Sequence, residues 1–168
     1  ELMTATVESG LLEVDTLQAW RHNPTVYVEL IGNAIFTPFS VEYAPAADRW
    51  EEEGLVPRDV MRSMGQLGLL GIRYPEEFGG ANWDTVASVI LAEERGRATY
   101  GGFAITVLTQ TDTASPHIAT GGSAVQKTRY LPGIVSGEIV VAIAITEPGA
   151  GSDVAGIRTS AVRAGDAW

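Results

Sequence analysis

The apolar residues of this 168-residue chain change their spacing once, near Gly137. Before that point they recur every three or four residues, as at Val60, Met64 and Leu67, which is the period of a helix with one buried face. Residues 138–145 then read Glu-Ile-Val-Val-Ala-Ile-Ala-Ile, a partly β-branched run typical of a buried strand. The sequence therefore predicts a mainly α fold, with a helical domain at 46–137 followed by the first strands of a β domain at 138–168.

Proline, glycine and capping residues divide the helical part. Pro57 is expected to be the first residue of a helix that Gly68 and Gly71 close, and Asp84 can cap another. Ser123-Ala-Val-Gln126 is a capping box, in which serine and glutamine each satisfy a backbone N–H of the other. The expected helices are 57–70, 84–97, 103–113, and one from 124 to Tyr130-Leu131-Pro132, together with two in residues 2–43 broken near Asn23-Pro24. A second strand is expected at 159–162.

Charge and composition exclude several classes of function. The chain has 11 Lys and Arg against 21 Asp and Glu, a formal net charge of -10, which repels phosphate backbones and anionic lipid. We therefore expect no nucleic-acid partner and no membrane. No apolar run reaches the roughly 18 residues that span a bilayer, and the first residues lack a signal-peptide pattern, so a cytoplasmic protein is expected, or a mitochondrial-matrix one in a eukaryote.

Metal and carboxylate chemistry find little support. The chain has no cysteine, and His22 and His117 are its only histidines, so no metal site is expected. Glu51-Glu-Glu53 and Glu93-Glu94 are interpreted as solvated helix faces and not as paired catalytic carboxylates. His117 is expected at a helix end, with an acyl channel as the alternative, and Trp20, Trp50 and Trp83 are expected to pack in the interior.

The segment that can carry chemistry is the glycine-rich stretch Ala144-Ile-Thr-Glu-Pro-Gly-Ala-Gly-Ser-Asp-Val-Ala-Gly156. Small residues let a ligand approach the backbone, whose free N–H groups can hold phosphate or carbonyl oxygens, while Thr146 and Ser152 add hydroxyls. These properties suit a nucleotide cofactor. A P-loop is excluded because no Lys follows the second glycine, and the dinucleotide fingerprint fails because Val154 stands where a third Gly or Ala is required.

The same thirteen residues resemble, without a gap, the flavin signature of the acyl-CoA dehydrogenase family. Four further segments agree in the order that the family requires, so that the resemblance covers roughly residues 46–168: Gln66-Leu-Gly-Leu-Leu-Gly-Ile72, Pro75-Glu-Glu-Phe-Gly-Gly80, Gln126-Lys-Thr-Arg-Tyr-Leu-Pro132 and Ser136-Gly-Glu138. The resemblance implies a helical N-terminal domain of acyl-CoA dehydrogenase type and an enzyme that introduces a double bond between the alpha and beta carbons of acyl-CoA thioesters, with FAD as cofactor.

The resemblance also implies roles for single residues. Ile143, Ile145 and Thr146 are expected to line the flavin ring, and Gly151 and Ser152 to contact FAD, with Ser152 also near the acyl-CoA substrate. Glu147, Pro148 and Asp153 are expected to shape the turn.

In the family, a glutamate of the C-terminal helical domain is the catalytic base, and no residue of this chain matches it. We therefore expect no catalytic residue within 1–168, an N-terminal portion inactive by itself, and FAD binding that is weak or absent in it. The implied partners are an electron-transferring flavoprotein or similar acceptor and further copies of the chain in a homo-oligomer. Neither the length of the acyl chain nor the number of subunits is predicted.

Two alternatives to this function stay open. The chain can be a folded, non-catalytic fragment or interaction module without flavin, which a colourless preparation would indicate. A nicotinamide-dependent oxidoreductase on a doubly wound sheet is disfavoured, because both the third glycine and the crossover helix are missing.

Residues 1–45 fit the dehydrogenase pattern poorly. Trp20-Arg-His-Asn-Pro-Thr-Val-Tyr27 and Gly32–Pro45 weakly resemble an uncharacterised bacterial helical family that is distantly similar to zinc metallopeptidases, without that family's metal motif. One hypothesis is a hybrid chain with a junction at 45–49, and the alternative is a divergent dehydrogenase N-terminus. We expect a segment of foreign origin to pack separately from the helices at 57–70 and 84–97.

Overall fold

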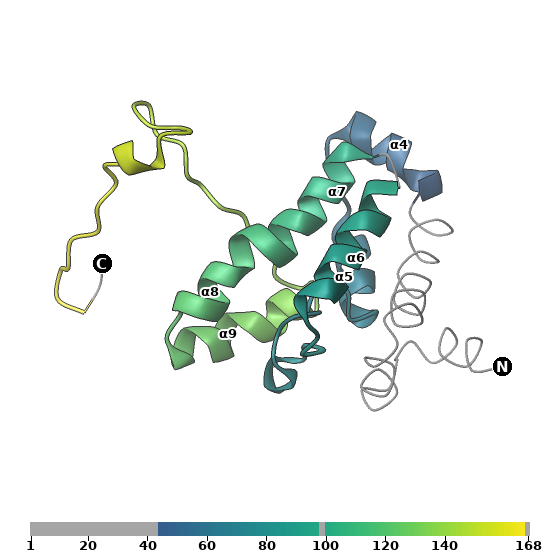
Figure 1. Cartoon of the computed structure of the whole chain (residues 1–168), viewed down its shortest axis with the longest axis horizontal. Coiled ribbons are helices and arrows are strands. Elements are labelled where there is room, and N and C mark those ends of the chain that lie inside the picture. The colour runs from purple at the N-terminus through teal and green to yellow at the C-terminus, as the bar shows by residue number, and fades with distance from the viewer. Residues whose placement is uncertain (1–43, 98–99, 167–168) are drawn as a thin grey trace.

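A computed structural model describes residues 44–97 and 100–166 of the chain, and these residues are mainly helical (Figure 1). The two helices predicted within residues 2–43, and the predicted separate packing of a foreign N-terminal segment, fall outside the described residues. The α-helices are α4 (Ala44–Glu53), α5 (Arg58–Gln66), α6 (Thr85–Arg97), α7 (Gly101–Leu108), α8 (Ser115–Gly121) and α9 (Ala124–Val135). Shorter turns are η2 (Glu76–Phe78), η3 (Thr109–Ala114) and η4 (Val154–Gly156). The predicted mainly α class is confirmed, and no described helix is long and apolar enough to span a membrane.

The core lies where α4, α5, α6 and α7 meet. Trp50 of α4 packs on Phe103 of α7 with ring centroids 5.6 Å apart, which confirms a packing role for this tryptophan. Trp83 also packs against the core, from the loop before α6. The other buried members of the core are Ala47, Val60, Met61, Met64, Leu69, Leu70, Ile72, Ala87, Ile90, Leu91 and Val107.

The ends of α5 and α6 follow local sequence signals. Pro57 is the residue before α5 and not its first helical residue, a one-residue correction to the prediction. Gly68, at φ +74°, ends α5: its N–H bonds to the Gly65 carbonyl, and the next N–H, of Leu69, bonds to the Met64 carbonyl. Asp84 caps α6 as expected, because its carboxylate accepts the N–H of Ala87 at 3.2 Å.

The helix predicted at 103–113 is longer than expected. It begins at Gly101 and continues as α7, η3 and α8 to Gly121, where η3 is a π-helical turn. Pro116 explains the turn: it has no N–H to donate to the preceding helical turn, yet the chain stays helical. In a π turn each carbonyl accepts the N–H of the residue five positions later. For the Thr111 carbonyl that residue is Pro116, which has no N–H, and the Tyr74 hydroxyl donates to this carbonyl instead, at 3.2 Å.

The capping box at the start of α9 is confirmed, with the Ser123 side chain accepting from the Gln126 N–H and the Gln126 side chain accepting from the Ser123 N–H. The predicted end of this helix at Pro132 is wrong, because α9 continues through Pro132 to Val135. Leu131, Ile134 and Val135 are all buried, and their burial offsets the helical hydrogen bond that proline removes.

The run after Gly137 does not pair as a strand among the described residues. Residues 138–146 and 159–162 carry no regular structure, and an isolated bridge joins Glu147 and Ala150. A strand needs a neighbour to hydrogen-bond its backbone, and two short strands separated by a turn are marginal without more of a sheet. The predicted strands therefore appear as an open segment that extends away from the helices (Figure 1).

Candidate functional site

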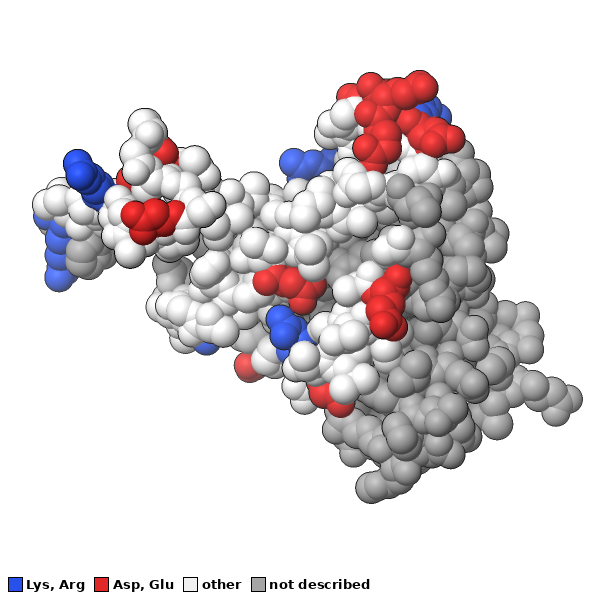
Figure 2. Space-filling model, turned by 45° about the horizontal axis from the view of Figure 1, so that its top comes forward, with Lys and Arg blue, Asp and Glu red and all other residues white. Residues whose placement is uncertain are grey.

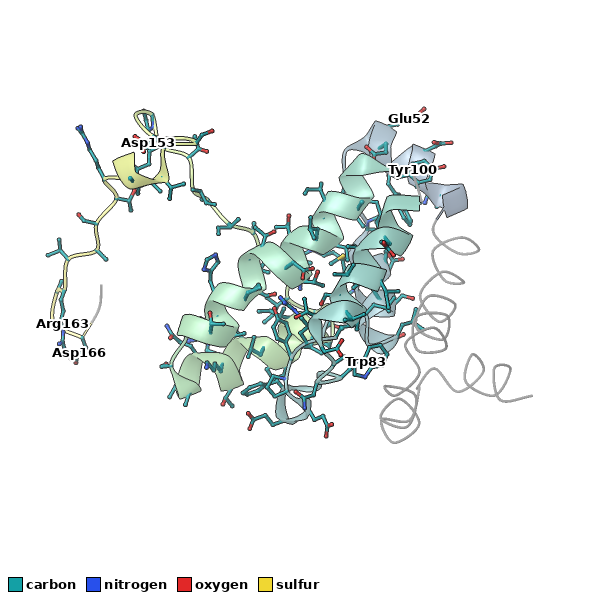
Figure 3. All side chains as sticks on the ribbon, in the orientation of Figure 1. Glu52, Trp83, Tyr100, Asp153, Arg163 and Asp166 are labelled. Carbon is teal, nitrogen blue, oxygen red and sulfur yellow. The ribbon has the colours of Figure 1, made fainter. Side chains whose placement is uncertain are left out.

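The glycine-rich turn stands apart from the helical body and is closed by its own backbone. The N–H of Glu147 donates to the Ala150 carbonyl at 2.8 Å, and the N–H of Ala150 donates back to the Glu147 carbonyl at 3.2 Å. Figure 3 shows Asp153, just after this turn, on the segment that leaves the helices, whereas Trp83 lies at the helical body. The turn therefore has a defined local shape without support from the helices.

The Glu147 carboxylate ties the turn to the residues that follow it. It accepts the N–H groups of Arg158 at 2.9 Å and Thr159 at 2.7 Å, and it also accepts the Thr159 hydroxyl. The Thr159 hydroxyl, followed by the two N–H groups, holds the pKa of the Glu147 carboxyl below its usual value. Glu147 therefore shapes the turn, as expected, through N–H groups of the residues after it, and it is half-buried. A carboxylate held in its ionised form is also a poor proton acceptor.

The predicted cofactor residues lie on one short stretch of ten residues, 143–152. Ile143 is half-buried, whereas Ile145, Thr146, Gly151 and Ser152 are exposed, Ile145 at 45% of its surface. Within the described part of the chain, neither the Thr146 nor the Ser152 hydroxyl makes a hydrogen bond. A Cβ built on Gly151 meets nothing within 4 Å, so the backbone there is open to a ligand.

These properties fit a flavin nucleotide in their chemistry. The stretch offers two uncommitted hydroxyls, an open glycine backbone and two isoleucine side chains beside them. Hydroxyls and backbone N–H groups suit phosphate and carbonyl oxygens, and apolar side chains suit a flat ring. All of these groups come from one segment of the described chain, residues 143–152.

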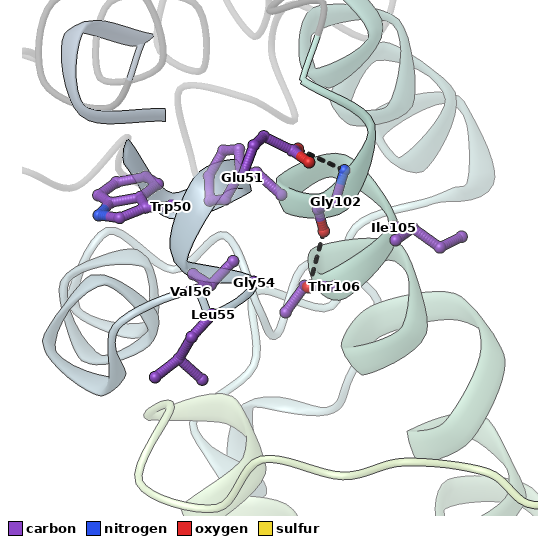
Figure 4. Close-up of a pocket in the computed structure, with 9 residues that line it drawn as sticks. Trp50, Glu51, Gly54, Leu55, Val56, Gly102, Ile105 and Thr106 are labelled. Carbon is purple, nitrogen blue, oxygen red and sulfur yellow. Dashed lines mark hydrogen bonds between the residues drawn. The ribbon is translucent and has the colours of Figure 1, made fainter. Parts of the chain in front are cut away.

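A separate cavity of about 240 Å³ lies between α4 and α7 (Figure 4). Trp50, Leu55 and Ile105 line it, and Glu51 stands at its edge, where its carboxylate accepts the N–H of Gly102 at 2.6 Å. Glu51 thus caps the N-terminus of α7, a role that the solvated-face interpretation missed. Its position directly after the buried Trp50 gave no local signal, because the N–H it caps is 51 residues away in the sequence.

The remaining predicted candidates lie away from the turn. His117 is exposed on α8, and Glu52, Glu53 and Glu93 are exposed on their helices. Figure 2 shows acidic side chains gathered at one end of the helical body, where α4 carries Asp48 and Glu51–Glu53. Among residues 44–97 and 100–166, no three His, Asp or Glu side chains are grouped to hold a metal ion.

Known proteins with similar sequences are acyl-CoA dehydrogenases. The family described as "Acyl-CoA dehydrogenase, N-terminal domain" matches residues 33–138, starting before the hypothetical junction at 45–49. The long-chain specific acyl-CoA dehydrogenase of mouse mitochondria is 38% identical over 132 residues. That alignment covers 77% of this chain and 30% of the mouse protein, so the chain spans about a third of its relative's length.

Solved structures agree with the sequence comparison. The acyl-CoA dehydrogenase of Geobacillus kaustophilus superposes with a TM-score of 0.76 at 37% identity, over 83% of this chain and 36% of that one. An acyl-CoA dehydrogenase of Bacillus anthracis, solved in complex with FAD, gives a TM-score of 0.72 at 36% identity, over 78% of this chain and 22% of that one. Since the helical fold, the family match and these relatives all agree, the chain belongs to the acyl-CoA dehydrogenase family.

Proposed function

We propose that this protein is an FAD-dependent acyl-CoA dehydrogenase in which residues 143–152 form one wall of the flavin and thioester site. The observation that carries the proposal is the turn itself. Its shape is held by the Glu147 carboxylate and the bridge to Ala150, while the Thr146 and Ser152 hydroxyls stay uncommitted within the described residues. Such preorganised and unused polar groups are what a ligand site requires.

Each residue of this wall has a role in the proposal. Ile143 and Ile145 line the flavin ring, Thr146 and Gly151 contact the flavin through polar groups, and Ser152 reaches both FAD and the acyl-CoA. The flavin, when bound, accepts the hydride that leaves the beta carbon of the thioester. Residues 1–168 bind and orient these groups, and removal of the alpha proton belongs to a glutamate of the family's C-terminal helical domain.

The proposal extends to organisation and partners. We assign residues 46–137 to the helical domain and 138–168 to the beginning of a β domain. An electron-transferring flavoprotein or similar acceptor reoxidises the enzyme, which works as a homo-oligomer in the cytoplasm, or in the mitochondrial matrix of a eukaryote.

Titration of FAD into the chain of 168 residues tests the proposal, with quenching of flavin fluorescence as the signal. One wall of a site should bind with a Kd well above 1 µM, because contacts from a single segment supply only part of the binding free energy. Submicromolar affinity contradicts the one-wall arrangement, whereas a Kd above about 1 µM or no binding agrees with it.

Two variants assign the binding to the turn. Thr146→Ala and Ser152→Ala should each raise the Kd about 5- to 30-fold, the equivalent of about 1 to 2 kcal/mol for one lost hydrogen bond. Ser160→Ala is the matched control, because Ser160 is an exposed serine outside the turn. Equal affinities for Ser152→Ala and Ser160→Ala would place the flavin elsewhere.

A dye-coupled assay with acyl-CoA thioesters of several chain lengths tests the assignment of the base. Residues 1–168 alone should give no turnover. Turnover that disappears in Glu147→Gln would instead make the turn glutamate a base, contrary to the hydrogen bonds that hold it ionised.

A further inference from the structure

The buried side chain of Gln110 connects the helical body to the segment that carries the turn. Gln110 lies in the π turn η3 and is 0% exposed. Its amide nitrogen donates to the carbonyls of Ile134 at 3.1 Å and Ile139 at 2.8 Å, and its amide oxygen accepts the N–H of Val141 at 2.9 Å. Both N–H groups and the oxygen of one buried amide are therefore directed to the end of α9 and the residues beyond it.

The contacts to Ile139 and Val141 imitate a neighbouring β-strand. On one side of a strand, the carbonyl of one residue and the N–H of the residue two positions later point the same way. A partner strand donates an N–H to that carbonyl and accepts that N–H with one of its own carbonyls. The Gln110 amide supplies this pair of groups from a helix. It thereby fixes the orientation of the backbone at 139–141, where Val140 packs against the core.

The contact to Val141 is the last hydrogen bond between the helical body and this segment before the turn. Earlier anchors exist at the end of α9, where Ile139 N–H bonds to the Gly133 carbonyl and Glu138 pairs with Arg62 at 3.0 Å. Within the described part of the chain, residues 142–146 make no hydrogen bond, and the segment leaves the helices there (Figure 1). The direction of departure is therefore set at Val141.

The distance from this anchor to the turn makes its orientation matter. Five residues separate Val141 from Thr146, which is about 17 Å of extended chain, so a swing of about 10° at the anchor displaces Thr146 by about 3 Å. Binding groups must be held to within about 0.5 Å of their working positions. Without this anchor, the turn would therefore no longer keep a fixed position and orientation relative to the helices.

We infer that Gln110 is a positioning residue whose buried amide sets the direction in which the segment carrying Thr146 and Ser152 leaves the helical domain. The inference depends on the proposed function only in identifying that segment as a flavin contact. The π turn helps to position Gln110, because it places four residues together on the buried side of one helix: Gln110, Thr111, Ala114 and Ser115.

The test compares Gln110→Met with Val107→Ala in the full chain. Methionine keeps an unbranched side chain of similar length but makes none of the three hydrogen bonds. Val107 is equally buried on the preceding helical turn and makes no hydrogen bond to 139–141, so its truncation controls for general loss of stability. Gln110→Leu removes the same three hydrogen bonds with a shorter apolar side chain, and it provides a second variant if methionine prevents folding.

Hydrogen exchange of the Val141 amide is the first measurement. Gln110→Met should accelerate exchange at Val141 at least about tenfold relative to Val107→Ala, because the acceptor of that N–H is gone and local opening becomes easier. Gln110→Leu should accelerate exchange at Val141 to a similar extent. Equal exchange at Val141 in Gln110→Met and Val107→Ala overturns the inference.

The second measurement reports direction. Because the chain has no cysteine, nitroxide labels can be placed at Val125→Cys on α9 and Ala155→Cys beyond the turn, both at exposed positions. The distribution of distances between the labels should broaden clearly in Gln110→Met and stay as narrow as in the parent in Val107→Ala. An unchanged distribution in Gln110→Met overturns the inference. Neither measurement uses FAD, so failure of the flavin proposal and failure of this inference are separate results.

Discussion

Replacing Tyr74 by phenylalanine tests how the π turn in the long helix is stabilised. The Tyr74 ring is buried, with 6% of the residue exposed, and its hydroxyl donates to the Thr111 carbonyl at 3.2 Å. The same hydroxyl lies 2.5 Å from the Ser115 hydroxyl, which in turn donates to the Gln110 carbonyl. Pro116 has no N–H for the Thr111 carbonyl, so Tyr74→Phe removes the donor that replaces it.

The expected loss of stability follows from these contacts. Ser115 keeps its contact with Gln110, whereas the Thr111 carbonyl loses a donor in the protein interior. A lost hydrogen bond costs about 0.5 to 1.5 kcal/mol in the free energy of unfolding, and the Tyr74 hydroxyl has two such contacts, to Thr111 and Ser115. For a domain of this size the Tm should fall by roughly 4 °C for each kcal/mol.

Urea unfolding followed by tryptophan fluorescence measures this free energy directly. Tyr130→Phe is the matched control, since Tyr130 is only half-buried and its hydroxyl makes no hydrogen bond among the described residues. The control should change the free energy of unfolding by less than about 0.5 kcal/mol. A loss in Tyr74→Phe no larger than in Tyr130→Phe would refute the account of the π turn.

The same variant makes a prediction about alkaline pH. Burial raises the pKa of Tyr74, an effect that the Asp112 charge reinforces and that Ser115 and Arg73 partly oppose. A group with a raised folded pKa stabilises fully below its unfolded pKa, here 10.0, and loses that contribution as the pH rises through the folded pKa. The stability difference between parent and Tyr74→Phe should therefore narrow above pH 10.0.

Further predictions concern the close packing after α9 and the glycine-rich turn. Gly137→Ala should lower the free energy of unfolding in urea by more than about 2 kcal/mol, because φ is +77° and a Cβ would lie 2.1 Å from the Met61 carbonyl oxygen. Gly149→Ala is the control: a Cβ there meets nothing within 4 Å, so the loss should be under about 0.5 kcal/mol. Comparable losses in the two variants would contradict this packing. The pKa of Glu147 is lowered in the folded protein, so its contribution to stability is present above its unfolded value of 4.5 and is lost as the pH falls through the folded pKa. In acid, hydrogen exchange of the Thr159 amide, which donates to this carboxylate, should therefore accelerate relative to its intrinsic rate. Glu147→Gln should show the faster exchange already at neutral pH, and unchanged protection there would show that the carboxylate does not hold the turn.

Signals that act over a few residues were readable from the sequence. The Asp84 cap, the Ser123–Gln126 capping box and the turn carboxylate Glu147 were each predicted and each make the expected hydrogen bonds. The thirteen-residue match at 144–156 identified the family that the comparisons then showed. In the two caps the interacting groups are three residues apart, so their geometry follows from local backbone conformation, and the partners of Glu147 follow 11 and 12 residues later.

Tertiary structure decided the features whose partners are far apart in the sequence. Buried neighbours carry α9 through Pro132, Tyr74 supplies the donor that Pro116 cannot, and the apolar run after Gly137 stays unpaired for lack of an adjacent strand. Gln110 reads in the sequence as one polar residue in an apolar helix, yet it bonds to a backbone about 30 residues later. Local sequence determined the caps, the turn and the helical period, because hydrogen bonds between near neighbours depend only on the residues beside them. The long-range partners of Tyr74 and Gln110 exist only after the helices pack, because burial then forces each isolated polar group to find a donor or acceptor within the fold.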